Sequence, residues 1–191
     1  MAQPKLTTGL ISVAEYLAAE NDGSWRHEFV NGMVYAMAWA SERHNVIKLN
    51  IAGLLNSLVP EPCRIFDGDM KLQILDDDDQ RFYYPDVFVT CGPSDETQHS
   101  RTDAVLVMEV LSPTTKRADR YEKFDTYKKL PSLSEYALIE QDFPRIELFR
   151  RFNGWQREVY QPDDTVEFER IHQRLAFDQI YRRVSFFAGP T

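Results

Sequence analysis

The spacing of apolar and polar positions predicts three elements in the first third of the chain. Ser12 and Glu15 stand three residues apart at the start of an apolar stretch, a capping-box pattern that predicts a short helix ending near Glu20. Apolar runs on both sides of Asn31-Gly32 predict a β-hairpin over residues 27–37, because this dipeptide accepts the two positive φ values of a type I′ turn. The apolar residues between positions 41 and 58 recur at helical spacing, and the predicted helix ends before Pro60.

Apolar runs and turn residues predict a strand-rich middle and C-terminal part. A charged helix is predicted from about Asp119 to Leu130, and Leu175 to Val184 is predicted to be a closing helix. The predicted strands are 64–75, 81–90, 104–111 and 135–140, with a second hairpin over 145–151 and 155–160. The acidic run 76–79 is predicted to be a solvated turn between the first two strands. This order fits an α/β (α+β) fold in which helices cover both faces of a central sheet and hairpins are added.

Composition limits the class of protein. The 191 residues, of which 43% are hydrophobic, predict one domain over 1–191 with a substantial core. No apolar run approaches the roughly 18–20 residues of a membrane helix, and the N-terminal residues lack the apolar core of a secretion signal. We therefore expect a soluble cytoplasmic protein without a membrane partner. Two cysteines, Cys63 and Cys91, are predicted to be free thiols in a reducing compartment.

The charge pattern separates the chain as a whole from one of its segments. The net charge of −8 argues against avid, non-specific DNA binding, which depends on the neutralisation of phosphates, but it suits carboxylates that hold a divalent cation. Residues 116–129 contain six Lys or Arg and three Asp or Glu, so this segment is locally +3. It is either a solvated charged helix or a surface that meets a phosphate.

Two acidic residues stand among apolar neighbours. Asp86 follows Pro85, and Glu109 interrupts the apolar strand 104–111. A carboxylate in such surroundings is costly unless it is paired or binds a metal. If the two strands are neighbours at one edge of the sheet, Asp86 and Glu109 could share a hard cation, with the backbone carbonyl of Val110 as a further ligand. Alternatively, Asp86 caps a turn and Glu109 pairs with a lysine or arginine.

The charged helix adds a third candidate element. Asp119, Lys123 and Tyr127 recur at intervals of four and share one helical face. We expect Lys123 to project toward the two acids. The alternative is a solvent-exposed Asp119–Lys123 pair of the kind that is common on helix surfaces.

Taken together, these residues resemble a known family. Four features are similar to the Uma2 family, also called DUF820, of the restriction-endonuclease-like PD-(D/E)XK superfamily. They are Pro85-Asp86, the segment 109–115 that begins with Glu109, the spacing of Asp119, Lys123 and Tyr127, and the pair Glu135-Tyr136. The resemblance covers nearly the whole chain and includes Glu28 and His44. It implies a nuclease fold with a central mixed sheet.

The resemblance also implies a site and a cofactor. Asp86 and Glu109 match the family's metal-binding acids, and Mg²⁺ or Mn²⁺ is the expected ion. Position 111 is leucine where the superfamily motif has lysine, so the lysine function is expected to have moved to Lys123. The implied activity is hydrolysis of phosphodiester bonds in nucleic acid, with DNA as the expected partner. Glu28 and His44 match family positions, and His44 could equally be a packed residue at the start of a helix.

Three other functions stay open. The chain could be a catalytically inactive nuclease-fold protein that binds nucleic acid or acts as a regulatory module. Ser112 could be a hydrolase nucleophile, although it lacks the Gly-x-Ser-x-Gly elbow and is followed by Pro113, so a turn cap is the better interpretation. The chain could also be an interaction protein, in which the aromatic residues of the second hairpin support a homodimer. Such a dimer is compatible with each of the other functions as well. The aromatic residues are Phe149, Phe152, Trp155 and Tyr160.

Overall fold

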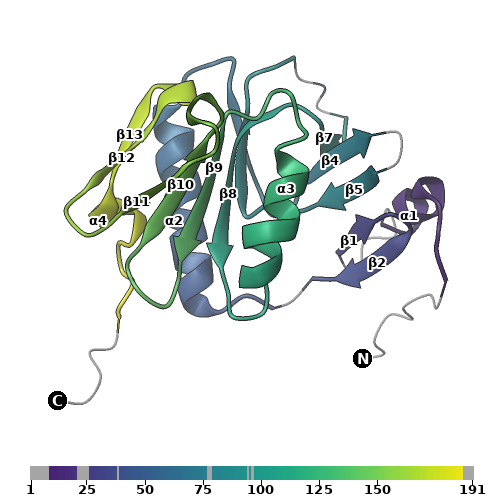
Figure 1. The fold of residues 1–191 in the computed structure, drawn as a ribbon, viewed down its shortest axis with the longest axis horizontal. Helices are drawn as coiled ribbons and strands as arrows, with labels where there is room; N and C mark the ends of the chain where they lie inside the picture. The colour runs from purple at the N-terminus through teal and green to yellow at the C-terminus, as the bar shows by residue number, and fades with distance from the viewer. Residues whose placement is uncertain are drawn as a thin grey trace.

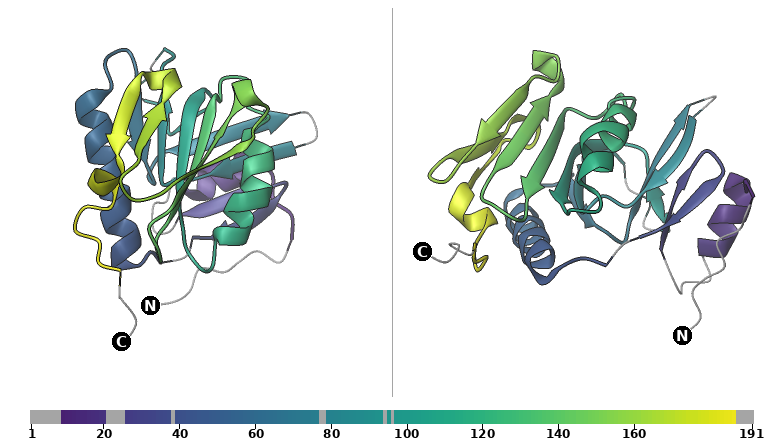
Figure 2. Two further views of the ribbon diagram at one scale, coloured as in Figure 1. Left: turned by 60° about the vertical axis from the view of Figure 1, so that its left-hand side comes forward. Right: turned by 60° about the horizontal axis from the view of Figure 1, so that its bottom comes forward.

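The computed structural model describes residues 9–20, 26–37, 39–76, 79–93, 95 and 97–186. Its strands form two larger sheets and one separate hairpin, and its helices pack against the faces of the two larger sheets (Figures 1 and 2). The arrangement confirms a mixed α/β fold, although the strands are divided between two sheets where a single central sheet was predicted.

The first sheet has five strands and carries the N-terminal hairpin at its edge. In spatial order the strands are β2 (Met33–Ala36), β1 (His27–Val30), β5 (Asp79–Tyr83), β4 (Lys71–Asp76) and β7 (Ser100–Arg101). Helix α1 (Val13–Glu20) packs on one face through Tyr16, whose ring lies 5.0 Å from that of Phe29 and 5.3 Å from that of Phe82.

The second sheet has six strands and is covered by helices on both faces. In spatial order the strands are β11 (Arg157–Tyr160), β10 (Ile146–Arg150), β9 (Glu135–Glu140), β8 (Ala104–Leu111), β6 (Val87–Thr90) and β3 (Arg64–Asp67). Strands β8 and β9 are parallel and the other neighbours are antiparallel, so the sheet is mixed, as predicted. Helix α2 (Glu42–Leu58) covers one face, and the π-helical segment η1 (Ala118–Lys123) with helix α3 (Phe124–Tyr127) covers the other.

Local sequence signals predicted the N-terminal elements correctly. Glu15 N–H donates to Ser12 Oγ at 3.2 Å, while Ser12 N–H donates to Glu15 Oε2 at 2.8 Å, which completes the capping box. Asn31 and Gly32 have φ values of 49° and 90°, and they join β1 to β2 as the Asn-Gly signal indicated. Ser41 caps α2 by accepting a hydrogen bond from His44 N–H.

Two predicted strands are wrong because each spans two sheets. The predicted strand 64–75 is divided into β3 and β4 by a turn in which Met70 N–H donates to the Asp67 carbonyl at 3.1 Å. The predicted strand 81–90 is divided into β5 and β6 at Pro85. At the second break Tyr83, Tyr84 and Pro85 stay buried, so the apolar pattern hides the crossing between sheets. The first break contains Asp67-Gly68-Asp69, in which both aspartates are exposed, and this polar turn signal was passed over in the prediction of one continuous strand. The acidic turn lies partly outside the described residues, and its ends pair as Asp76 with Asp79.

The C-terminal part also differs from prediction. Of the predicted helix from Leu175 to Val184, only a single turn at Phe177–Ile180 is helical, because its first two residues end a strand and a turn follows at 181–183. The two-stranded hairpin that precedes this helical turn was not predicted. These elements are β12 (Thr165–Phe168), β13 (Gln173–Ala176) and α4 (Phe177–Ile180). Alternation in β12 places Val166 and Phe168 in the core beside α2, and this tertiary burial decides the strand conformation.

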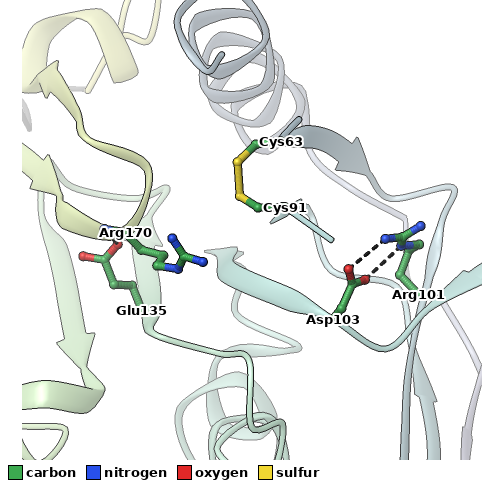
Figure 3. Close-up of a disulfide and its surroundings, with 6 residues drawn as sticks. All are labelled: Cys63, Cys91, Arg101, Asp103, Glu135 and Arg170. Atoms are coloured by element: carbon green, nitrogen blue, oxygen red, sulfur yellow. Dashed lines mark hydrogen bonds and ion pairs between the residues drawn. A yellow bond between two sulfur atoms is a disulfide. The ribbon is translucent and has the colours of Figure 1, made fainter. Parts of the chain in front are cut away.

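The two cysteines form a disulfide, so the prediction of free thiols is wrong (Figure 3). Strands β3 and β6 pair antiparallel with Arg64 opposite Thr90, and Cys63 and Cys91 are the next pair in the same register. Their Cα atoms lie 3.9 Å apart. The two cysteines are 28 residues apart in the sequence, and that separation gave no sign of the pairing. The pairing depends on the register of the two strands, which the sequence does not reveal. Both cysteines line a cavity of about 1020 Å³ at this end of the sheet.

Within the part of the chain that the structure describes, no helix is both long enough and apolar enough to cross a membrane.

A candidate nuclease site between the two sheets

Asp86 and Glu109 meet where β6 begins beside β8. Val87 lies opposite Met108, so the antiparallel register brings Asp86 to Glu109. The backbone N–H of Asp86 donates to Glu109 Oε2 at 3.1 Å, and the N–H of Val110 donates to Asp86 Oδ2 at 2.8 Å. Each carboxylate is therefore held by the backbone of the other residue's strand. The two strands lie inside the sheet and not at its edge, contrary to prediction, because Pro85 marks the passage from one sheet to the other.

Lys123 reaches the same point from η1. Its Nζ lies 2.8 Å from Glu28 Oε1, 3.4 Å from Asp119 Oδ1 and 3.6 Å from Glu109 Oε1. Only 8% of Lys123 and 2% of Asp119 is exposed. The predicted orientation of Lys123 toward the acids is confirmed, and the alternative of a solvent-exposed Asp119–Lys123 pair is excluded.

The helix that carries these residues is not the continuous α-helix predicted from about Asp119 to Leu130. Residues Ala118–Lys123 are π-helical, and the α-helical turn that follows ends at Tyr127. A π-helical turn contains more residues than an α-helical one, so residues four apart fall slightly short of alignment in η1 and slightly beyond it in α3. The two offsets oppose each other, and Asp119, Lys123 and Tyr127 still share the buried face.

His44 and Tyr127 support the two acids from opposite faces of the sheet. His44, in the first turn of α2, places Nε2 3.1 Å from Asp86 Oδ2. Its Nδ1 is buried without a hydrogen-bond partner among the described residues. Tyr127 donates its hydroxyl hydrogen to Glu109 Oε1 at 3.0 Å. The four additional residues suggested by resemblance, Glu28, His44, Asp119 and Tyr127, thus all lie at the site, each in contact with Asp86, Glu109 or Lys123.

Burial and mutual repulsion set the electrostatics of the site. Burial raises the pKa of Glu109 well above its usual range, and although the Lys123 ammonium opposes this, the nearby Asp119 and Asp86 raise the pKa further. The pKa of Asp119 is also raised by burial. Burial alone would lower the pKa of Lys123, but the carboxylates of Glu109, Glu28 and Asp119 outweigh it and raise that pKa, so Lys123 stays charged.

The donor atoms of this cluster suit a hard cation. Four carboxylates, from Glu28, Asp86, Glu109 and Asp119, surround one lysine and one histidine, which leaves an excess of negative charge. Asp119 Oδ1 is buried without a hydrogen bond, and no described residue donates to Asp86 Oδ1. The described residues contain no group of three or more His, Cys, Asp or Glu already placed to hold a metal. Mg²⁺, however, commonly uses one or two carboxylates and completes its shell with water and phosphate.

Two further tyrosines lie at the site, and neither was assigned to it from the sequence, although the resemblance rests partly on Glu135-Tyr136. The ring of Tyr83 lies 5.3 Å from Lys123 Nζ, and the hydroxyl of Tyr136 donates to the Asp119 carbonyl at 2.9 Å. Tyr83 stands two residues before Pro85 and Tyr136 begins a buried strand, so both fit the apolar pattern of a core. No local signal distinguishes such tyrosines from ordinary core residues.

Some predicted features do not belong to the site. Ser112 accepts a hydrogen bond from Thr115 N–H at 3.2 Å and so caps the turn after β8, in agreement with its interpretation as a turn residue. In the second hairpin Phe149, Trp155 and Tyr160 pack against the cores, while Phe152 is 70% exposed. The hairpin therefore uses most of its aromatic residues within the chain.

The fold and the site together define a mixed α/β protein of the nuclease-like class. The Uma2 family model, described as "Putative restriction endonuclease", matches residues 13–179. The chain belongs to the Uma2 family.

The chain is also similar to two relatives of known sequence and to one solved structure. "Uncharacterized protein slr1290" of Synechocystis sp. (strain ATCC 27184 / PCC 6803 / Kazusa) is 36% identical over 180 residues, which cover 92% of this chain and 94% of that protein. "Uncharacterized protein sll1609" of the same organism is 34% identical over 154 residues, which cover 78% of this chain and 86% of that protein. A crystal structure of "a putative nuclease belonging to DUF820" from Anabaena variabilis ATCC 29413 has the same fold, with a TM-score of 0.71, 18% identity, and coverage of 90% of this chain and 97% of that one.

Proposed function

We propose that this chain is a metal-dependent endonuclease that hydrolyses phosphodiester bonds, with DNA as its substrate. The observation that carries the proposal is the meeting of Asp86, Glu109 and Lys123 at one buried point, with Lys123 Nζ 3.6 Å from Glu109 Oε1. Two carboxylates can hold the metal ion that assists phosphodiester hydrolysis, and a charged lysine beside them can stabilise the negative charge that develops.

Asp86 and Glu109 would hold Mg²⁺ or Mn²⁺, with the backbone carbonyl of Val110 as a further ligand. Such an ion, when bound, polarises the phosphodiester and lowers the pKa of a coordinated water. The chain's own groups prepare the site: Val110 N–H and His44 orient Asp86, while Asp86 N–H and Tyr127 orient Glu109.

Lys123 stabilises the negative charge that develops on the phosphate, or orients the attacking water. Glu28 and Asp119 keep the ammonium charged and directed to this point. These two acids act on the reaction through Lys123, so we regard them as positioning residues.

Nicking of DNA by the purified protein tests the proposal. Supercoiled plasmid and single-stranded DNA are incubated with the protein in Mg²⁺, Mn²⁺ or EDTA. We expect cleavage only when a metal is present. Glu109→Gln should lower the cleavage rate by more than about 100-fold. Mutation of a residue that only hydrogen-bonds to a metal ligand typically lowers metal affinity or activity about 10–100-fold, and loss of the ligand itself should cost more. Asp125→Asn is the matched control, because Asp125 is an exposed acid on α3, and its rate should equal that of the wild type. Metal-independent cleavage, or equal rates in all three proteins, would contradict the proposal.

A second candidate is a nuclease-fold protein that binds nucleic acid without cleaving it. The observation that favours it is that Lys123 lies closer to Glu28 than to Glu109, at 2.8 against 3.6 Å, while position 111 is a buried leucine. Binding of labelled DNA by a protein that shows no metal-dependent nicking would support this function. RNA of the same sequence, included in each assay, distinguishes the two nucleic acids.

Two further predictions accompany the proposed function. A cytoplasmic location is the expectation for an enzyme that acts on cellular DNA. A homodimer also stays a prediction, for which the exposed Phe152 of the second hairpin is the available contact. Sedimentation of the wild type and Phe152→Ser tests the dimer, which the substitution should weaken if this hairpin forms the interface.

A further inference from the structure

Strand β2 exposes a line of large apolar side chains beside the candidate site. Met33 and Tyr35 of the strand are 47% and 46% exposed, and Met37 and Trp39, just beyond it, are 38% and 88% exposed. We call these four residues the β2 stripe. Exposed apolar side chains that follow one another along a strand are uncommon unless a ligand or partner covers them.

The β2 stripe lies on the face of its sheet that carries the site. Tyr35 is directly opposite Glu28 in the antiparallel register, so the two side chains point to the same face. Glu28 in turn contacts Lys123 Nζ at 2.8 Å. On the other face, Val34 and Phe29 are covered by α1. The stripe therefore continues outward from the site itself.

The chain leads from the stripe to the helix that supports Asp86. Trp39 is followed by the first turn of α2, whose His44 contacts Asp86. Two cations lie near the end of β9, and each is paired with an acid. Arg43 lies 3.6 Å from Asp142 Oδ1, and Lys116 Nζ lies 2.7 Å from Glu140. The apolar stripe therefore borders the site without an unpaired basic surface beside it among these residues.

Resting on the proposed function, we propose that the β2 stripe makes the enzyme act on single-stranded or locally unpaired nucleic acid, whose bases stack on Tyr35 and Trp39. Stacking needs an exposed base face, which paired bases within a duplex do not offer. The net charge of −8, and the pairing of Arg43 and Lys116 with acids, disfavour binding that depends on phosphate contacts along a duplex, so stacked bases would supply the affinity. The apolar surface and the charge balance therefore select the same substrate.

A second copy of the chain is the competing occupant, because β2 is an edge strand. A stable protein interface, however, uses about 20–30 residues on each side. The β2 stripe has only four residues, two of them on a strand of four residues, which suits a few stacked bases better than a protein surface.

Binding and cleavage measured on the same variants test the inference. A fluorescently labelled 20-nucleotide DNA of mixed sequence is titrated in EDTA, as a single strand and as a duplex, and anisotropy is recorded. We expect the single strand to bind at least about 10-fold more tightly than the duplex. Tyr35→Ala should weaken single-strand binding roughly 10-fold, Tyr35→Leu should weaken it similarly because it lacks a ring, and Tyr35→Phe should retain binding. Single-strand binding should also quench tryptophan fluorescence in the wild type and much less in Trp39→Phe.

Tyr121→Ala is the matched control, since Tyr121 is an exposed aromatic residue of η1 outside the β2 stripe, and it should bind like the wild type. Equal affinity for single strand and duplex, or equal binding by Tyr35→Ala and the wild type, would overturn the inference. So would a loss of self-association in Tyr35→Ala without any change in DNA binding. Metal-dependent cleavage that does not respond to Tyr35→Ala refutes the stacking surface and leaves the proposed function intact. Tyr35-dependent binding without cleavage in any metal refutes the proposed enzyme and leaves the stacking surface intact.

Discussion

The segment η1 contributes to two buried groups of charges that differ in how completely they are paired. The first is the candidate site, where Asp119 and Lys123 meet Asp86 and Glu109. The second is a cluster in which Arg120 binds Glu147 at 2.5 Å and Glu140 at 2.8 Å. Lys116 lies 2.7 Å from Glu140, and Arg145 lies 2.9 Å from Glu147. We call this second group the Arg120 cluster.

Both groups are buried, but they differ in the ratio of cations to carboxylates. In the Arg120 cluster three cations surround two carboxylates, and the unpartnered atom is a donor, Arg145 Nε. In the site the carboxylates outnumber the cations, an oxygen of Asp119 is left without a hydrogen bond, and the pKa of Glu109 is raised. A buried cluster that satisfies its acids anchors the helix to the sheet. One that leaves acids in excess is instead suited to receive a cation from outside.

The largest expected effect comes from breaking the Arg120 cluster. Arg120→Met should lower the free energy of unfolding by about 3 kcal/mol, since Glu140 and Glu147 are 2% and 1% exposed and would lose a shared cation. Arg117→Met, an exposed position in the same segment, should change it by less than about 0.5 kcal/mol. Urea denaturation at pH 7 measures both. If the two variants were equally stable, the Arg120 cluster would not be the anchor of η1.

Metal binding should produce the next effect, at the site alone. A cation that binds only the folded protein stabilises it by about 2.7 kcal/mol at 100-fold excess over Kd. We expect Mn²⁺ to raise the melting temperature of the wild type accordingly. Glu109→Gln should be as stable as the wild type in EDTA, because one of several repelling acids is removed, and should lose most of the Mn²⁺ response.

Asp125→Asn serves as the control and should keep the full Mn²⁺ response, since Asp125 lies on the exposed side of α3. The opposite result would be a destabilised Glu109→Gln and a wild type that does not respond to metal. That pair of outcomes would mean that Glu109 is a structural partner of Lys123, and that the site resembles the Arg120 cluster after all.

A third carboxylate sharpens the comparison through its pH dependence. Burial tends to raise the pKa of Asp79, but hydrogen bonds from Arg81, Lys129 and Asn31 outweigh burial and lower the pKa to about 2. The folded pKa thus lies below the ordinary value, and Asp79 contributes stability above about pH 4 that is lost as the pH falls through about 2. The partners of Asp79 thus lower its pKa, whereas burial and the neighbouring acids raise the pKa of Glu109.

Asp79→Asn should therefore be about 2 kcal/mol less stable than the wild type at pH 7, and the difference should shrink toward zero near pH 2. Chemical denaturation across this range measures the difference. Asp125→Asn, at an exposed acid, should show little difference at any pH. A constant gap between Asp79→Asn and the wild type would show that lost packing, and not lost charge, explains the effect.

A residue of the site could be proposed from the sequence only where its neighbours in the chain indicate that a charged side chain is buried. Asp86 and Glu109 stand out because their apolar neighbours imply burial, and Asp119 and Lys123 because their spacing implies a common face. Resemblance added Glu28 and His44. Tyr83 and Tyr136 could not be found in this way, since a buried tyrosine that supports a charge looks the same in sequence as one that only fills the core.

The sequence by itself determined the elements whose signals are local: the capping box of α1, the Asn-Gly hairpin, the capped helix α2, and the buried strands β8 and β9. Each depends on contacts within a few residues, which a pattern can express. Only the tertiary structure decided the division into two sheets, the pairing of Cys63 with Cys91, the π-helical start of the charged helix, and the convergence of Glu28 and His44 on the acids. These features depend on strand register and on which helix covers which face, and both are set by pairings between residues far apart in the chain.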